Sequence, residues 1–394
     1  MPRGFDDVPG SLPLDRISPD LDLNTVPFSN IAENVLQSLS DSVFDDEALW
    51  RDHLSMTGQI RTFSGGERIR EQWASYCKER NPHDFKTQKA RVSRQTPSSS
   101  WIDVPFTFST AQQGGLVGNC YGIISFVPDS ERAGWKVWML RTTLENFEGY
   151  GHPDDPSPIF RTPTAATNSS SQCEHRVSVL IIGAGQSGLS LAGRLGALSI
   201  PYILLEKEAE IGYSWTGKYD GVRQHTIKEM NNLPFDRTYS ACDPDFLPAK
   251  TVAEGFENYV SKYCINIWLA AEVEECLTSG GEIGWIVNVR RGGEQYVIKA
   301  RHLVLSMGAG QSVPNPPKIP NASSFKGTVL DIGTFKNSSP WKGKKGVVVG
   351  SATGAHDGSY SQLPFFLLQS ISESTDKVLL NQLNVIGYSQ KYQD

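Results

Sequence analysis

Hydrophobic and polar residues recur with two different periods in the first part of the chain. Three segments have helical spacing, and in the second of them acidic residues follow Ser42, a suitable N-cap. Downstream the period falls to two, which predicts strands joined by turn-rich segments. The predicted helices are 31–39, 42–56 and 65–78, and the predicted strands are 86–94, 101–109, 116–127 and 135–144. Helices followed by strands predict an α+β domain over residues 29–150, a cone with a strongly curved antiparallel sheet.

Two polar stretches border this domain. Residues 1–28 contain Pro and Asp with little periodicity, which predicts a loose, extended arm. Residues 151–174 are dense in Pro, Ser, Thr and Asp and offer almost nothing to bury, so we predict a linker there. A second domain then begins near residue 175.

The second domain opens with the strongest local pattern in the chain. A continuous apolar run, Val177 to Ile182, predicts a buried strand and leads into GAGQSG at residues 183–188. A helical pattern follows, and a second strand, Tyr202 to Leu205, ends at Glu206. Strand, Gly-rich turn, helix, strand and acid in this order predict a dinucleotide-binding unit of a Rossmann-type α/β fold. The alternative is a Gly-rich turn that binds no nucleotide.

Each residue type in this unit suits a dinucleotide. Gly183 would make the tight turn, Gly185 would let backbone N–H groups approach a pyrophosphate, and Gly188 would let helix and strand pack closely. The pyrophosphate would lie at the positive end of the helix. Glu206, at the end of the second strand, could accept a hydrogen bond from a ribose hydroxyl. Because a carboxylate disfavours a 2′-phosphate, the pattern predicts FAD or NAD here.

The remaining pattern of the second domain predicts one more helix and several strands. The helix is 252–263, and the strands are 265–273, 285–290, 295–298, 302–308 and 346–349. Strands 285–290 and 295–298 form a hairpin around Gly292 and Gly293.

Composition excludes several classes of protein. The chain has 394 residues and a formal charge of −6, which gives no basic field for nucleic acid or a membrane surface. No apolar run is long enough to span a bilayer, and the first residues lack the apolar core of a signal peptide. We therefore expect a cytoplasmic protein. The six cysteines show no metal-ligand spacing, so we predict neither disulfides nor a metal site.

Asp52 and His53 are candidate acid/base residues in the first domain, because they would lie near the mouth of a cone. The alternative is a surface pair on a helix, which would have no chemical role.

Four short motifs that follow Glu206 narrow the function. They are Gly-Tyr-Ser-Trp at 212–215, Gln-His-Thr at 224–226, Leu-Pro-Phe at 233–235 and Phe-Leu-Pro-Ala-Lys at 246–250. Together with GAGQSG, they resemble the flavin-containing monooxygenase superfamily, particularly its plant YUCCA-like and fungal members. The element order of the first domain resembles the NTF2-like or SnoaL-like fold.

The resemblance implies a set of cofactor contacts. In the superfamily the residues matching Trp215 and His225 lie along the flavin, Val273 matches a backbone contact to adenine, and Gly308 lets backbone pass close to FAD. Gly350 to Asp357 resembles the second nucleotide motif, which holds NADPH. The candidate cofactor-binding residues are Gly183, Gly185, Gln186, Ser187, Gly188, Glu206, Lys207, Trp215, His225, Val273, Gly308 and Gly350. No side chain is assigned a catalytic role.

The chain departs from the superfamily pattern at several points. Asp331 stands where the superfamily has a histidine, Ala352 stands where it has a glycine, and Ser306-Met307-Gly308 replaces Ala-Thr-Gly. Superfamily members continue for more than a hundred residues beyond the second motif, whereas this chain ends at Asp394. We therefore expect a FAD-binding domain over 175–345 that is incomplete at its C-terminus, followed at 346–394 by the start of an NADPH-binding domain and a divergent tail.

The resemblance implies a FAD-dependent monooxygenase. It would use NADPH and O₂ to oxygenate a small organic molecule through a flavin C4a-hydroperoxide, in fungal secondary metabolism. Two alternatives stay open. One is a Baeyer–Villiger monooxygenase, and the other is a non-catalytic remnant whose N-terminal cone binds a ligand or partner. Dimerisation through the NTF2-like domain is also left open, and we expect no nucleic-acid or membrane partner.

Overall fold

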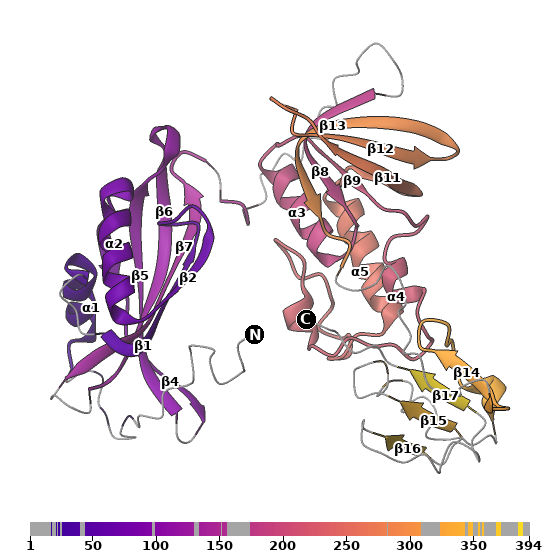
Figure 1. The fold of residues 1–394 in the computed structure, drawn as a ribbon, viewed down its shortest axis with the longest axis horizontal. Coiled ribbons are helices and arrows are strands. Elements are labelled where there is room, and N and C mark those ends of the chain that lie inside the picture. The colour runs from indigo at the N-terminus through magenta and orange to yellow at the C-terminus, as the bar shows by residue number, and fades with distance from the viewer. Residues whose placement is uncertain are drawn as a thin grey trace. The chain divides into compact units, whose positions relative to one another are not determined.

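The chain forms two units, Met1–His152 and Pro153–Asp394, in a computed structural model (Figure 1). The structure describes residues 17, 21, 23, 26–39, 44–96, 99–129, 134–150, 152–155, 174–281, 283–308, 324–342, 346–349, 354, 357, 368–371 and 385–388.

The first unit is a curved sheet with helices against it (Figure 1). Its elements are α1 (Phe28–Gln37), β1 (Phe44–His53), β2 (Ile60–Ser64), α2 (Gly66–Arg80), β3 (His83–Thr87), β4 (Arg91–Thr96), β5 (Ser99–Ala111), the 3-10 helix η3 (Gln113–Gly115), β6 (Val117–Pro128) and β7 (Trp135–Phe147). The strand order is β2-β1-β7-β6-β5-β3, and β4 also pairs with β5. β1 runs parallel to β7, while the other pairs are antiparallel.

Alternating apolar residues build the core of this unit. On β5 the side chains of Ile102, Val104 and Phe106 are fully buried and face the core cluster that the helices complete. Trp50 on β1 packs edge-on against Trp73 of α2, with ring centroids 5.1 Å apart. The period of two therefore places one row of each strand against the helices, as the sequence predicts.

The segment 42–56 is a strand and not the helix that its acidic residues suggest. β1 pairs with β2 on one side and with β7 on the other. Asp45 and Glu47 lie where the register with β7 shifts, and the Glu47 N–H donates to Asp45 at 3.0 Å. The acids thus mark a bulge, where an aspartate bonds to its own backbone, and not the first turn of a helix.

Other predictions for the first unit had mixed outcomes. The helices near 31–39 and 65–78 are confirmed as α1 and α2, but 86–94 is two strands, β3 and β4. The predicted loose arm is wrong at Ile17, which is 3% exposed and lies in the core. Its N–H donates to Ser100 and its carbonyl accepts from Arg94, at 3.1 and 3.2 Å. Most of the predicted arm lies outside the described residues.

The second unit begins with a six-stranded sheet. Its elements are β8 (Glu174–Ile182), α3 (Gln186–Ala197), β9 (Tyr202–Leu205), α4 (Tyr213–Thr216), the 3-10 helix η4 (Lys228–Asn231), α5 (Ala249–Lys262), β10 (Ile267–Trp268), β11 (Ala271–Thr278), β12 (Trp285–Arg291) and β13 (Glu294–Leu305). The order is β10-β9-β8-β13-β12-β11. The first four strands are parallel, and β13, β12 and β11 form an antiparallel meander.

Both faces of the parallel strands are covered. On β9, Tyr202 and Leu204 belong to the cluster formed with α3 and α5, and Ile203 and Leu205 belong to the cluster formed with β11 and β12. Figure 1 shows α3 and α5 on one side of this sheet. The predicted order of strand, turn, helix and strand is confirmed.

Two predicted boundaries in this sheet are wrong. Segment 265–273 is divided between β10 and β11 by a turn at Ala270, whose φ is +51°. Segment 295–298 and residues 302–305 instead form one long strand, β13, because that strand pairs with β12 at one end and with β8 at the other, and residues 306–308 lie beyond its end.

A second sheet follows in the same unit. Its elements are β14 (Thr328–Asp331), the 3-10 helix η6 (Ser339–Trp341), β15 (Gly346–Val349), β16 (Leu368–Ile371) and β17 (Val385–Tyr388). The four strands are parallel in the order β14-β17-β15-β16. β15 was predicted, whereas β16 and β17 come from the segment taken as a divergent tail. Among the described helices, none is long and apolar enough to cross a bilayer.

Candidate functional site

The Gly-rich turn lies at the carboxyl end of β8, and its three glycines have different surroundings. Gly183 has φ +101°, and a Cβ there would lie 2.5 Å from the Ser306 carbonyl oxygen. A Cβ on Gly188 would lie 2.0 Å from the Gly183 carbonyl oxygen. At Gly185 a Cβ would meet nothing within 4 Å. Two glycines therefore permit close packing, and the third borders open space.

The N-terminus of α3 borders the same open space. Gly185 is its N-cap, and no described side chain caps the helix. The first N–H groups of a helix have no acceptor within it and carry the positive end of the helix dipole. Gln186 and Ser187 are exposed beside them. This end of α3 can thus accept a pyrophosphate.

Glu206 follows β9 and closes the turn from the other side. Its carboxylate accepts the N–H of Ala184 at 2.9 Å and the N–H of Glu208 at 3.1 Å. The side chain is half-buried, so carboxylate oxygen lone pairs remain for a ribose hydroxyl. Lys207 is exposed, and its ammonium lies 3.7 Å from Glu208.

Ser306 joins the end of β13 to the Gly-rich turn by hydrogen bonds. It follows β13, and its hydroxyl lies 2.8 Å from the carbonyl oxygens of both Ile182 and Gly183. The sequence did not assign this role, although a small hydroxyl residue before a predicted close approach was a usable signal. Gly308 has φ +78°, a left-handed conformation that suits glycine.

Val273 is placed in β11, opposite Val289 of β12. The start of β11 lies against Glu206, because the Ala271 N–H donates to the Glu206 carbonyl at 2.8 Å. Val273, the predicted adenine contact, is thus only two residues from Ala271, which is hydrogen-bonded to Glu206, the predicted ribose contact.

Trp215 on α4 packs between two apolar clusters of the second unit. It is half-buried, and the Lys218 ammonium lies 5.2 Å from its ring centroid. Burial lowers the pKa of Lys218, and the nearby Asp357 carboxylate opposes that shift. The ring is thus held by packing on one side and by a cation on the other.

His225 has a partner from a distant part of the chain. Its Nε2 lies 3.5 Å from Asp357 Oδ2, and the same oxygen accepts the Tyr219 hydroxyl at 2.5 Å. Burial, followed by this hydrogen bond, raises the pKa of Tyr219. The sequence gave neither Tyr219 nor Asp357 a role, since they are 138 residues apart.

The segment from Gln224 to Leu247 is tied down by buried polar groups. The Lys228 ammonium is buried and donates to the carbonyls of Ala241, at 2.8 Å, and Asp243. The Gln224 N–H donates to the Leu247 carbonyl at 2.9 Å, but its Oε1 is buried with no hydrogen-bond partner among the described residues. An orphaned buried acceptor is costly, and a ligand donor would satisfy it.

These features fit FAD. The carboxyl ends of three parallel strands meet at Gly183, Glu206 and Ser306, where open α/β sheets bind dinucleotides. A helix N-terminus that no described side chain caps and a carboxylate are available to a pyrophosphate and a ribose. The residues present therefore agree with a FAD site.

The second nucleotide motif is described only in part. Gly350 lies outside the described residues, whereas β15 before it and Asp357 after it are placed. Asp331, which replaces the superfamily histidine, accepts the Gly333 N–H at 2.8 Å and shapes the turn after β14. This aspartate thus has a local role in backbone structure.

Asp52 and His53 do not form a surface pair on a helix, since neighbouring residues of β1 point to opposite faces of the sheet. Asp52 is fully buried and accepts hydrogen bonds from five groups. The donors are the Ser55, Thr57 and Thr142 hydroxyls and the Met56 and Thr57 N–H groups. The exposed His53 accepts from Arg51 at 3.1 Å. The buried carboxylate therefore holds the turn after β1.

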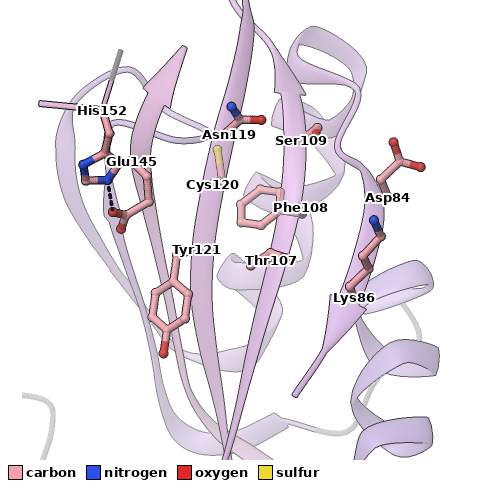
Figure 2. A pocket seen from close by; sticks show the side chains of 10 residues that line it. All are labelled: Asp84, Lys86, Thr107, Phe108, Ser109, Asn119, Cys120, Tyr121, Glu145 and His152. Atoms are coloured by element: carbon pink, nitrogen blue, oxygen red, sulfur yellow. Dashed lines mark ion pairs between the residues drawn. The ribbon is translucent and has the colours of Figure 1, made fainter. Parts of the chain in front are cut away.

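The first unit also carries a hollow of about 530 Å³ on its sheet (Figure 2). Its lining comes from β3, β5, β6 and β7 and the residues after them: Asp84, Lys86, Thr107, Phe108, Ser109, Asn119, Cys120, Tyr121, Glu145 and His152. His152 lies 3.9 Å from Glu145. Burial raises the pKa of Cys120 to about 11, so its thiol stays protonated. The described residues contain no cluster of His, Cys, Asp and Glu that could hold a metal ion.

Comparison with known proteins gives similarity to part of the flavin-containing monooxygenases. No family model matches the chain. Indole-3-pyruvate monooxygenase YUCCA1 of Oryza sativa subsp. japonica is 31% identical over 179 residues, which covers 43% of this chain and 41% of that protein. Probable indole-3-pyruvate monooxygenase YUCCA10 of Arabidopsis thaliana is 27% identical over 190 residues, 48% of this chain and 49% of that protein. The chain thus spans less than half the length of these relatives.

Solved flavoenzyme structures give weaker likenesses. S-allyl-L-cysteine S-oxygenase from Allium sativum has a TM-score of 0.47 and 18% identity, and the match covers 54% of this chain and 62% of that chain. The sequence similarity itself supports a relationship to the flavin-containing monooxygenases.

Proposed function

We propose that this chain belongs to a FAD-dependent monooxygenase that uses NADPH and O₂ to oxygenate a small organic molecule. The observation that carries the proposal is the geometry at the ends of β8, β9 and β13, where Gly185 borders open space at an uncapped helix N-terminus. Similarity to indole-3-pyruvate monooxygenases supports the reaction class. When bound, reduced FAD would supply the oxygen-activating chemistry.

The chain's own residues would bind and orient the cofactor. The N–H groups at the start of α3 would hold the pyrophosphate, Glu206 the ribose, and the backbone near Val273 the adenine. Trp215 and His225 would lie along the flavin and limit the access of water. NADPH would bind at the motif that includes Gly350.

Finer assignments belong to the same proposal. We assign the domains as an NTF2-like domain at 29–150, a linker at 151–174, a FAD-binding domain at 175–345 and the start of an NADPH-binding domain at 346–394. Fungal secondary metabolism, a cytoplasmic location and a dimer through the NTF2-like domain complete it. The hollow in Figure 2 supports a second role for the first unit, the binding of a small polar molecule, because hydroxyl, amide and charged side chains line it.

The decisive experiment is FAD binding by the purified full chain. We expect yellow protein that releases FAD on denaturation, and loss of FAD in Gly185→Val. A valine Cβ meets no protein atom within 4 Å, so the variant should fold normally while its side chain occupies the place of the pyrophosphate. The control is Gly280→Ala in the turn between β11 and β12, at the opposite end of β11 from Ala271, where an added Cβ would also meet nothing within 4 Å. A well-folded wild-type protein that takes up no added FAD would contradict the proposal.

A further inference from the structure

Asp357 joins two parts of the second unit that are distant in sequence. It belongs to the second nucleotide motif, whereas its partners, Tyr219 and His225, belong to the segment that the resemblance places along the flavin. Its carboxyl side chain is 18% exposed, and the His225 ring is 55% exposed. A mostly buried carboxylate therefore faces one side of a ring whose other side is open.

We propose that Asp357 is a positioning residue that fixes the orientation of the His225 ring in the flavin pocket. The role in the flavin pocket rests on the proposed function, but the contacts of Asp357 with His225 and Tyr219 do not depend on it. It differs from the cofactor contacts themselves, since Asp357 would act through His225 and would not touch the flavin.

The chemistry of the three groups explains how this would work. An ionised carboxylate only accepts hydrogen bonds, so the Nε2 atom that faces Asp357 is the one favoured to carry a proton. Nδ1 is then the ring atom left for the cofactor side. The Tyr219 hydroxyl, at 2.5 Å from the same carboxylate oxygen, anchors Asp357 from within the cluster of Tyr219, Val222 and Phe335. The Asp357 carboxylate thus orients the His225 ring, and the Tyr219 hydroxyl in turn orients the Asp357 carboxylate.

A simpler explanation is that Asp357 merely ties the two parts of the unit together. Other contacts already do this. Asp220 accepts the Asn337 amide at 3.0 Å, and the Lys336 ammonium donates to the Gly217 and Lys218 carbonyls. Asp220 therefore provides a matched control: it is a carboxylate next to Tyr219 that also bonds to a distant segment, and among the described residues it forms no hydrogen bond or ion pair with His225. Lys218 also faces Asp357 electrostatically and must be left intact in every variant.

The test uses the full chain labelled with ¹⁵N-histidine, first without FAD and then with FAD added. His225 is assigned from the signals lost in His225→Gln. In Asp357→Asn, we expect the His225 ring nitrogens to shift, and in Asp357→Glu to return toward wild type. Asp220→Asn should leave them unchanged. Asp357→Asn should also weaken FAD binding about tenfold, by analogy with the low end of the loss seen when the outer-shell partner of a metal-binding histidine is removed.

Two further variants separate positioning from folding. Tyr219→Phe removes the anchor but keeps the carboxylate, so it should lower stability while retaining most of the His225 signal. In the His225→Gln background, Asp357→Asn should weaken FAD binding no further, because residues that act through one another are non-additive. Unchanged His225 signals in Asp357→Asn, or equal effects of Asp357→Asn and Asp220→Asn, would overturn the proposal. If wild type binds no FAD, the proposed function fails, and the nitrogen shifts still decide the positioning role.

Discussion

Gly183 and Gly188 are adjacent in space, and each leaves room for a backbone carbonyl where other residues have a side chain. The contact between the Gly188 α-carbon and the Gly183 carbonyl is the tighter one, since a Cβ there would approach to 2.0 Å. Because that neighbour is backbone, it cannot move aside without shifting β8 or α3. The same residue type thus has a packing role at Gly188, and at Gly185, under the proposed function, it would give a ligand access to the helix N-terminus.

Gly188→Ala should therefore destabilise the second unit, whereas Gly185→Ala should not. We expect a loss of about 1–3 kcal/mol for Gly188→Ala, the usual cost of overpacking. Gly185→Ala should melt like wild type but bind FAD more weakly. Thermal melts with and without FAD distinguish the two effects. Equal melting of all three proteins would show that α3 can move to admit a methyl group.

His175 makes the second unit sensitive to acid. Its ring packs edge-on against Trp268, with centroids 4.8 Å apart, and burial lowers its pKa. Below about pH 6.5 the unfolded chain takes up the proton more readily than the folded one. The stability gained from neutral His175 is thus complete above that pH and is lost as the pH falls through the lowered folded-state pKa.

His175→Phe keeps an aromatic ring at the contact and removes the titration. We expect the unfolding free energy of the variant to fall less than that of wild type between about pH 7.5 and about pH 5.5. Urea unfolding at both pH values measures the difference. Parallel pH curves for the two proteins would mean that His175 stays protonatable in the fold.

At the scale of elements, the connection from β1 to β2 is built around one buried carboxylate. The Asp52 carboxylate accepts hydrogen bonds from donors of residues 55–57 and also from the Thr142 hydroxyl of β7, at 2.6 Å. Trp50 in turn donates to that hydroxyl at 3.0 Å. The turn, two strands and a core tryptophan therefore depend on the same acceptor.

Asp52→Asn should destabilise the first unit by on the order of 3 kcal/mol, because an amide NH₂ would face donors in a buried site. The control is Asp46→Asn, on the same strand but exposed. Chemical unfolding of both variants tests the expectation. A cost below that of the control would show that the turn rearranges around the amide.

The elements that the sequence predicted well are those specified by local pattern. The unit from Val177 to Glu206 combines a buried strand, a Gly-rich turn and an amphipathic helix, and its order is confirmed. Segment 42–56 failed because pairing with β2 and β7 outweighed its helix-start signals. The contact between His225 and Asp357 could not be predicted either, since it arises from how two distant segments meet. Periodicity carries no information about such pairs.

At the scale of the whole molecule, the two units have separate cores. The first is centred on residues such as Trp50 and Phe106, and the clusters of the second unit share no residue with it. Domains with their own cores commonly unfold as separate units. Stability changes in one should thus leave the other unaffected.

We therefore expect two calorimetric transitions for the full chain. Asp52→Asn should lower one of them, Gly188→Ala should lower the other, and added FAD should raise only the transition that Gly188→Ala lowers. A single transition that moves with both substitutions would show that the units unfold together.

The buried ammonium of Lys228 has a consequence for chemical labelling. Acylating reagents attack a neutral amine that they can reach, whereas this nitrogen is enclosed and donates to the Ala241 and Asp243 carbonyls. Exposed lysines such as Lys250 should react quickly, and Lys228 only when the segment around it opens. The acylation rate of Lys228, measured by mass spectrometry, would thus report how often the segment from Gln224 to Leu247 opens locally. Bound FAD should slow that rate.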